Sequence, residues 1–187
     1  MPYPAQVTPG RIIDAAAALI EQHGADQMSL HQLAADLGIR TPSLYRYFSN
    51  KSDLFRAVNL QTAHGLTAAM GAAIAQPHPD HAARVIASGL AYRGYAHSHP
   101  HCYLLAYSSG DPALRPDESA LAALAEQIQT SVAPLSMRYD SLTVLRGLWA
   151  MVHGFVTLEL AHQIRRGGDL DAVFRAAVEI YVRGLTA

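Results

Sequence analysis

The chain has little of several things that would assign it to other protein classes. Only one of its 187 residues is cysteine, which excludes an intrachain disulfide framework and suits a reducing cytoplasm. Charged residues make up 16% and the formal net charge is −1, which is low for a protein that binds nucleic acid by charge alone. The sequence lacks the roughly twenty uninterrupted apolar residues of a membrane-spanning helix, and its N-terminus lacks the basic and apolar regions of a signal peptide. We therefore expect a cytoplasmic protein that does not enter the membrane.

Enzyme motifs are missing as well. The sequence has no G-x-S-x-G elbow, phosphate-binding loop or dinucleotide fingerprint, so we expect neither an enzyme nor a bound cofactor. Half of the residues are hydrophobic and alanine is abundant, while no window shows the sustained alternation of a β-strand. These features predict an all-α protein, with a chain long enough for a small domain fused to a larger one.

The most informative segment runs from Met28 to Leu54, where two short helices are predicted to meet at Gly38. Ser29 followed by Gln32 fits a capping box at the start of the first helix. One buried face of that helix is indicated by apolar residues at three- and four-residue spacing, namely Leu30, Leu33, Ala34 and Leu37. A glycine at the end of such a helix favours the left-handed conformation that turns the chain sharply.

The second helix is predicted to begin at Thr41, as N-cap, with Pro42 in the first turn. Leu44, Tyr45 and Phe48 are expected to face inward, and Thr41, Ser43, Arg46 and Tyr47 outward. Asn50 with Asp53 then resembles the cap of a longer helix that starts at Lys51, the only lysine in the chain. Four basic residues lie between positions 40 and 56, against one acidic residue. Two helices at a tight turn with a local positive stripe favour a DNA-binding helix-turn-helix over a plain αα-corner.

The stretch from Ile12 to Phe55 resembles the N-terminal domain of the tetracycline-repressor (TetR) family of bacterial one-component regulators. The family's alanine-rich first helix and its three following motifs correspond here to AAAALIEQHG, LAADLGI, TPSLYRYF and SNKSDL. The likeness covers roughly the first third of the chain. Two departures are that Tyr47 stands where histidine is commoner and that Ala35-Asp36 replaces a more usual basic pair. Both could change the preferred operator.

This resemblance implies roles for individual residues. Thr41 and Pro42 correspond to residues that contact bases. The residues that correspond to phosphate contacts are Ser43, Tyr45, Arg46, Tyr47 and Lys51. Ser29 and Arg40, at the starts of the two short helices, complete our candidates for DNA binding. The implied organisation is a DNA-binding domain at residues 1–54 and an effector-binding and dimerisation domain at 55–187.

The remainder of the chain is predicted to form helices separated by proline- or glycine-containing breaks. The expected helices are 51–75, 80–97, 101–107, 117–133, 141–164 and a last one from about residue 170 to 185. The helix at 141–164 has apolar residues almost all round, so it must be covered on all sides. We expect a second subunit to cover part of it, in a four-helix bundle with two helices from each chain. The alternative is that both helices are core in a monomer. The interface candidates are Leu145, Leu148, Val152, Phe155, Val173, Val178 and Tyr181.

Trp149, His153 and Gly154 also resemble the W-x-x-x-H-G signature of one C-terminal subclass of the TetR family. If this part is a sensor, its pocket should be mostly apolar with a few polar groups that orient a ligand. The candidates are Tyr92, Tyr95, Tyr103, Tyr107, Met151, Trp149 and His153, and for each of them ordinary core packing is the alternative. The excess of tyrosine and histidine over phenylalanine favours a small effector that is amphipathic or partly aromatic.

His97, His99, His101 and Cys102 form the one cluster with the chemistry of metal ligands. They surround a proline at a helix break and have no second pair at zinc-finger spacing, so we assign no metal site. Metal sensing through this cluster remains one alternative, redox sensing through Cys102 a second, and a ligand-independent architectural DNA-binding protein a third. The preferred interpretation is a homodimeric regulator, most often a repressor in this family, that binds a palindromic operator in double-stranded DNA and is released by a small molecule.

Overall fold

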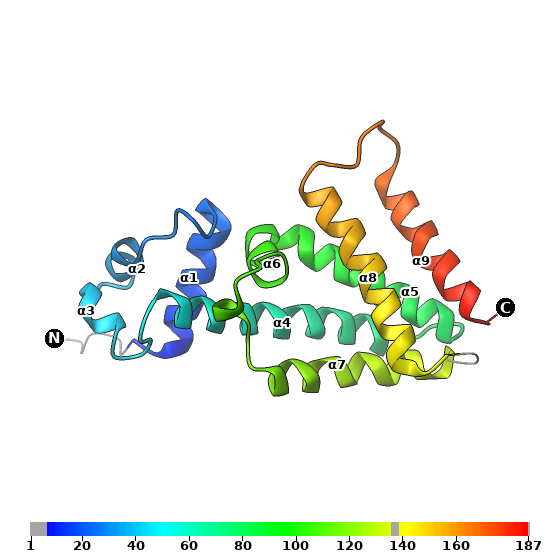
Figure 1. The fold of residues 1–187 in the computed structure, drawn as a ribbon, viewed down its shortest axis with the longest axis horizontal. Coiled ribbons are helices and arrows are strands. Elements are labelled where there is room, and N and C mark those ends of the chain that lie inside the picture. Colours follow the sequence, from blue (N-terminus) through cyan, green and yellow to red (C-terminus); the bar gives the residue numbers. More distant parts are fainter. Residues whose placement is uncertain (1–6, 136–138, 187) are drawn as a thin grey trace. The chain divides into compact units, whose positions relative to one another are not determined.

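A computed structural model of the chain describes residues 7–135 and 139–186, and Figure 1 shows that the described residues are helical, with no strand among them. The α-helices are α1 (Pro9–His23), α2 (Leu30–Asp36), α3 (Thr41–Leu44), α4 (Lys51–Ala75), α5 (His81–Ser98), α6 (Pro100–Tyr107), α7 (Glu118–Val132), α8 (Ser141–Leu160) and α9 (Leu170–Thr186). Short 3-10 turns lie at Pro112–Leu114 and Ala133–Leu135. The prediction of an all-α protein is confirmed, and most predicted helix ends agree within one or two residues.

The chain divides into two compact units, each with its own core. Unit 1 contains Met1–Ala63 and His99–Asp117, and unit 2 contains His64–Ser98 and Glu118–Ala187. Unit 1 therefore includes α6 and the connection that follows it, in addition to the predicted helix-turn-helix. The expected functional boundary at residues 54 and 55 stays a prediction, because compactness and function need not divide a chain at the same place.

Unit 1 has a core formed by α1 to α4 and α6. Its fully or nearly fully buried side chains include Ile12, Ala16, Ile20, Leu33, Ala34, Leu44, Leu54, Val58, Cys102 and Leu105. Gly38 has φ of 67°, as its predicted role in the turn requires. At the start of α4, Asn50 Oδ1 accepts a hydrogen bond from the Asp53 amide at 2.8 Å, and the Asp53 carboxylate accepts one from the Ser49 amide. The predicted cap of α4 is confirmed.

Three local expectations in unit 1 are wrong. The Ser29 hydroxyl does cap α2, but Gln32 donates to Asp36 at 2.6 Å and does not complete a capping box. Helix α3 already begins at Thr41, so Arg40 is its N-cap residue and provides no side-chain hydrogen bond. Tyr45 does not face inward, because 53% of it is exposed. The turn after Leu44 swings the next side chain out of the core.

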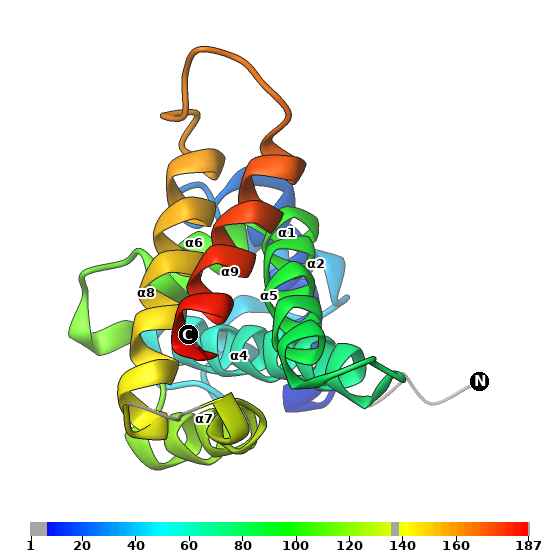
Figure 2. The same cartoon turned by 90° about the vertical axis from the view of Figure 1, so that its right-hand side faces the viewer.

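Unit 2 contains the later part of α4 together with α5, α7, α8 and α9. Helix α5 packs against α7, α8 and α9, and α8 lies beside α9, as Figure 2 also shows. The core side chains of unit 2 include Val85, Tyr92, Ala96, Val144, Leu148, Val152, Val156, Phe174, Val178 and Val182.

Helix α8 ends at Leu160, four residues before the predicted end at Ile164. His162 takes a left-handed conformation with φ of 53°. The Gln163 amide then donates to the Leu158 carbonyl at 2.8 Å and the His162 amide to the Glu159 carbonyl at 2.9 Å. This is a Schellman termination, which apolar periodicity did not reveal because histidine occupies the position usually held by glycine.

Helix α8 is long and apolar enough to cross a membrane by length and composition alone, which corrects the expectation that no segment would pass such a test. A single helix of this kind is weak evidence, since core helices of other proteins satisfy the same criterion. Only 22% of its most apolar window is buried within this chain, so much apolar surface of α8 has no cover among the described residues.

Candidate functional site

The predicted DNA-binding residues of α2, α3 and the following turn lie on the surface of unit 1. Ser29, Arg40, Pro42, Tyr45, Arg46 and Tyr47 are exposed, while Thr41, Ser43 and Lys51 are half-buried. Because Leu44 is the buried residue of α3, it fixes which face of this short helix remains outward. That outward face carries hydroxyl, guanidinium and aromatic groups, which donate hydrogen bonds to phosphates and base edges.

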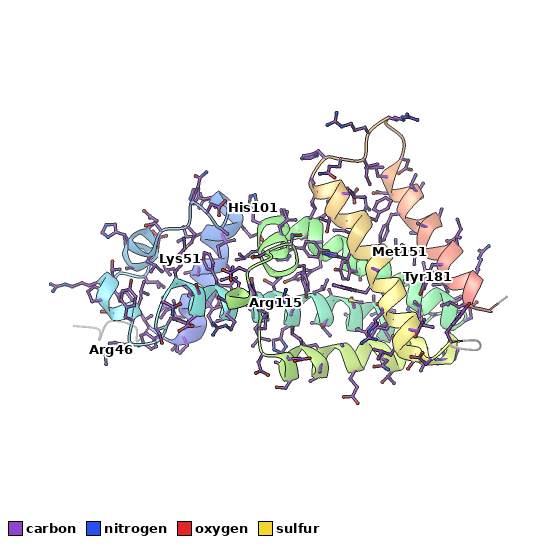
Figure 3. The ribbon with its side chains drawn as sticks, viewed as in Figure 1. Arg46, Lys51, His101, Arg115, Met151 and Tyr181 are labelled. Carbon is purple, nitrogen blue, oxygen red and sulfur yellow. The ribbon has the colours of Figure 1, made fainter. Side chains whose placement is uncertain are left out.

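Two of these residues already use polar hydrogens inside unit 1. The Lys51 ammonium donates to the Met28 carbonyl at 2.8 Å and lies 4.9 Å from the centre of the Phe55 ring. The Tyr47 hydroxyl donates to the Val7 carbonyl at 2.9 Å. Lysine keeps two further donors for a phosphate, whereas the single proton of a tyrosine hydroxyl is fully used. Figure 3 labels Arg46 and Lys51 on this part of unit 1.

The positive stripe inferred from the sequence is shorter in the structure. The Arg56 guanidinium pairs with Asp53 at 3.2 Å and donates to the Ala113 carbonyl at 3.0 Å. Arg56 therefore holds the connection after α6 in place. Arg40, Arg46 and Lys51 remain as the cations of the α2–α3 surface.

Helix α6 is attached to α1 through Glu21. The Glu21 carboxylate accepts hydrogen bonds from the Cys102 amide at 2.8 Å and the His101 amide at 3.2 Å, both in the first turn of α6. His101 Nδ1 also lies 2.7 Å from the Glu21 carbonyl oxygen. A carboxylate at the start of a helix satisfies amides that have no partner within that helix. The sequence gave no sign of this contact, because the residues are about eighty positions apart.

The proposed metal cluster does not form. His97 lies 2.9 Å from Glu159 in unit 2, whereas His101 and Cys102 contact Glu21 in unit 1. No group of three or more candidate metal ligands occurs among the described residues. The alternative of a metal-responsive regulator therefore loses its structural basis.

Cys102 should be unreactive in the folded protein. Burial raises the pKa of its thiol to about 12, with a further contribution from the nearby Glu21 carboxylate. The nucleophile in alkylation is the thiolate, which is scarce at pH 8 when the pKa is this high. Native protein treated with iodoacetamide at pH 8 should remain unmodified over a period in which the urea-unfolded chain reacts completely, as measured by intact mass. Equal rates would contradict the buried environment.

The predicted sensor residues are divided between the two units. Tyr103 and Tyr107 belong to α6 in unit 1, with ring centres 5.2 Å apart. Tyr92, Tyr95, Met151, Trp149 and His153 belong to unit 2. Tyr92 and Tyr103 are fully buried, while Met151, labelled in Figure 3, is half-buried.

Trp149 and His153 stack one turn apart on α8, with ring centres 5.2 Å apart. Burial lowers the pKa of His153, which favours a neutral imidazole at neutral pH. Trp149 is nevertheless 48% exposed. A side chain so open is better suited to contact another molecule than to fill the core.

The interface candidates on α8 and α9 fall into two groups. Leu148, Val152 and Val178 are buried within unit 2 and belong to the core of the subunit. The Tyr181 hydroxyl, labelled in Figure 3, donates to the Val144 carbonyl at 3.0 Å and so joins α9 to α8. Leu145 and Phe155 are half-buried, and Val173 is half exposed. Larger exposed apolar surface is contributed by residues that the sequence analysis did not select, namely Leu142, Trp149, Leu158 and Ile180.

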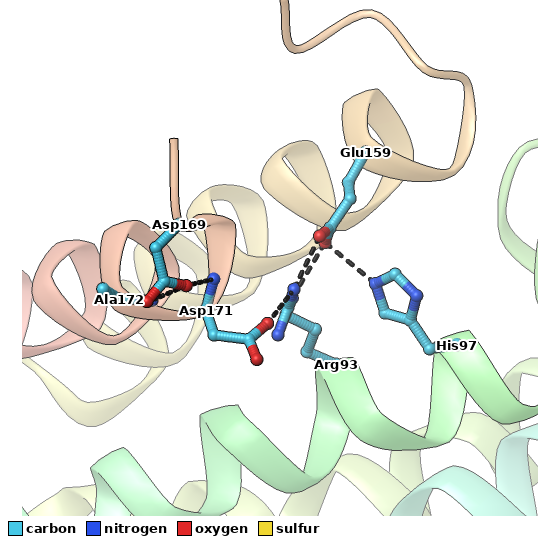
Figure 4. Close-up of polar contacts among 6 residues, drawn as sticks. All are labelled: Arg93, His97, Glu159, Asp169, Asp171 and Ala172. Carbon is cyan, nitrogen blue, oxygen red and sulfur yellow. Dashed lines mark hydrogen bonds and ion pairs between the residues drawn. The ribbon is translucent and has the colours of Figure 1, made fainter. Parts of the chain in front are cut away.

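A polar cluster joins three helices of unit 2, and sequence reasoning missed it (Figure 4). Arg93 on α5 makes two hydrogen bonds to Glu159 on α8, at 2.6 and 2.8 Å, and pairs with Asp171 on α9 at 2.7 Å. His97 lies 2.9 Å from the same Glu159 carboxylate. The Arg93 guanidinium also lies 5.4 Å from the centre of the Phe174 ring. Arg93, and to a lesser extent His97, hold the pKa of Glu159 below its usual range.

Comparison with known proteins decides the family. The model described as bacterial regulatory proteins of the tetR family matches residues 12–58, and the one described as the tetracyclin repressor-like C-terminal domain matches residues 85–181. The chain belongs to the TetR family. It is therefore a DNA-binding transcriptional regulator with an N-terminal helix-turn-helix, as the resemblance of its first third implied.

Relatives and solved structures of the TetR family extend over nearly the whole chain. The HTH-type transcriptional regulator Rv0681 of Mycobacterium tuberculosis is 30% identical over 175 residues, which cover 91% of this chain and 78% of that protein. A structure from Rhodococcus sp. RHA1 is similar over 100% of both chains, with a TM-score of 0.82 and 25% identity. TetR from Acinetobacter baumannii in complex with minocycline has a TM-score of 0.71 at 22% identity, with 96% of each chain covered. BioQ with its double-stranded DNA operator has a TM-score of 0.69 at 21% identity, covering 97% of this chain and 99% of that one.

Proposed function

We propose that the chain is a ligand-responsive repressor that binds a palindromic operator as a homodimer in the cytoplasm. The observation that carries this proposal is the outward face of α3 and the turn after it, where Pro42, Tyr45 and Arg46 are exposed above a buried Leu44. A recognition helix presented in this way enters the major groove in helix-turn-helix proteins.

The residues of this face are proposed to divide between bases and backbone. Thr41 and Pro42, at the start of α3, would contact base edges. Phosphates would be bound from Ser43, Tyr45, Arg46 and Lys51, with Ser29 and Arg40 at the two helix starts beside them. Because few cations are involved, non-specific binding should be weak and affinity should depend on dimer symmetry.

The homodimer is proposed to form through the outer faces of α8 and α9. Ile180 is 73% exposed and Val173 is 50% exposed, seven residues apart on one face of α9. On α8 the corresponding apolar side chains are Leu142, Trp149 and Leu158. A second copy that covers both helices forms the four-helix bundle expected from the sequence.

Release by a small molecule is the remaining part of the proposal. The sensor would use the aromatic and histidine side chains of unit 2, including the Trp149–His153 pair of the proposed W-x-x-x-H-G subclass. The minocycline complex of the A. baumannii TetR shows that a structural neighbour binds such a compound. A difference of roughly 1–3 kcal/mol in effector affinity between the DNA-bound and free arrangements is enough to release DNA measurably.

The experiment that tests the proposal is a selection of bound fragments from a random double-stranded DNA pool at near-physiological salt. Enrichment of a palindrome is expected, and would provide the probe for an effector screen. If refolded, ligand-stripped protein enriches no sequence, the repressor proposal is wrong.

Arg46→Ala is expected to weaken binding to all DNA sequences and to lower the slope of log Kd against log salt by about one phosphate equivalent. Thr41→Ala is expected to change the preferred operator instead. Both can be measured by fluorescence anisotropy over a salt series with the selected operator and single-base variants. An unchanged salt slope for Arg46→Ala, or a uniform loss for Thr41→Ala, would contradict the assigned contact.

A further inference from the structure

Tyr47 joins the recognition segment to the residue that precedes α1. Its hydroxyl donates to the Val7 carbonyl at 2.9 Å, across forty positions of the sequence. The next residue, Thr8, is the N-cap of α1, and its side chain accepts from the Arg11 amide at 3.3 Å. Val7 also packs partly buried against the core of unit 1. The hydrogen bond of Tyr47 therefore ends at a well-defined part of unit 1.

The recognition segment needs such an attachment because α3 is very short. It has four residues, with Leu44 as its buried side chain, and isolated helices of this length have no stability of their own. The turn that follows is held to the core by Phe48, which is half-buried. Tyr47 supplies a second attachment at the outer side of the same turn, where 40% of the residue is exposed.

We infer that Tyr47 is a positioning residue, which fixes the recognition segment against the start of α1, and that its hydroxyl does not bind a DNA phosphate. This inference rests on the proposed DNA-binding function of α3. It revises the role that the family resemblance implied for Tyr47. The chemical reason is that a phenol has one proton to donate, and here that proton is donated to a backbone carbonyl.

Tyr45 provides a matched control. It is a tyrosine two residues away on the same surface, and no intramolecular partner of its hydroxyl is described within residues 7–135 and 139–186. The variants Tyr47→Phe and Tyr45→Phe remove the same hydroxyl and keep both rings. The full chain is used in each case.

The first measurement is amide hydrogen exchange in the DNA-free protein. Tyr47→Phe should speed exchange at Arg11 and Ile12, whose amides bond to the Thr8 side chain and carbonyl, whereas Tyr45→Phe should not. Unchanged exchange in Tyr47→Phe would overturn the inference. This result does not depend on DNA, so it decides the attachment even if the protein binds no operator and the proposed function fails.

The second measurement separates positioning from phosphate contact by using operators that carry one neutral methylphosphonate at each backbone position in turn. Tyr47→Phe should weaken binding to the unmodified operator about three- to tenfold, the usual effect of one lost hydrogen bond, and by the same factor on every modified operator. The effect of Tyr45→Phe should disappear on one modified operator. If the effect of Tyr47→Phe also disappears at one position, its hydroxyl binds that phosphate and the inference is wrong. A Tyr47→Phe variant that binds with wild-type affinity would overturn it as well.

Discussion

Replacing Ile180 by glutamate should convert the proposed dimer into a monomer. Ile180 is the most exposed of the large apolar side chains in the described residues. Burying a carboxylate without a partner at an interface costs several kcal/mol, and the two-fold symmetry places two such charges in one interface. We expect the Kd of the dimer to rise on the order of 100-fold or more.

This result can be checked by sedimentation velocity over a concentration series, together with operator binding. Arg175→Glu is the matched control, since Arg175 is exposed on α9 at an angle well away from Ile180. The control should stay dimeric and keep its operator affinity. If Ile180→Glu remains a dimer at low concentration, the interface lies elsewhere.

Glu159→Gln should destabilise unit 2 by about 2–4 kcal/mol. The side chain of Glu159 is only 8% exposed and that of Arg93 is 15% exposed, so the substitution leaves the Arg93 cation poorly compensated within the protein. Asp171 still pairs with Arg93 but is 83% exposed, and it therefore restores only part of the lost interaction. Urea unfolding of the variant and of an Asp171→Asn control, which should lose about 1 kcal/mol or less, provides the comparison.

The pH dependence of the same experiment gives a second check. The folded-state pKa of Glu159 is lowered, chiefly by Arg93, so the unfolded chain binds a proton at higher pH than the folded chain does. The contribution of Glu159 is therefore fully present above its ordinary pKa of 4.5 and is lost as pH falls through the folded-state value. The stability difference between wild type and Glu159→Gln should be constant near neutral pH and shrink in acid. A difference that grows below pH 4.5 would contradict the ion pair.

Local sequence signals predicted the helix-turn-helix well. Gly38 and the Asn50–Asp53 cap act over a few residues, and their geometry depends on the backbone alone. Predictions about which surface a residue faces were less successful. Leu148 and Val178 were assigned to an interface but are core, because an apolar pattern shows that a residue needs cover without showing what provides it.

Long-range contacts could not be predicted from the sequence. Arg93 and Glu159 are 66 positions apart, and Glu159 lies in a helix whose other residues are mostly apolar. Likewise Arg56 belonged to a sequential cluster of cations, and only the fold shows that it holds the Ala113 carbonyl. Pairings of this kind depend on tertiary arrangement, for which a single sequence carries no periodic signal.

The composition of unit 1 has a consequence for how the protein is made. The chain leaves unit 1 after Ala63 and returns at His99, so the ribosome must synthesise α5 before the DNA-binding unit is complete. Until then Ile20 and its neighbours on α1 lack the Cys102 and Leu105 side chains that complete their core. A gene fragment that encodes the helix-turn-helix alone would therefore yield a domain with part of its core open to solvent. Within this chain the DNA-binding unit cannot be inherited or exchanged as an N-terminal cassette without residues 99–117.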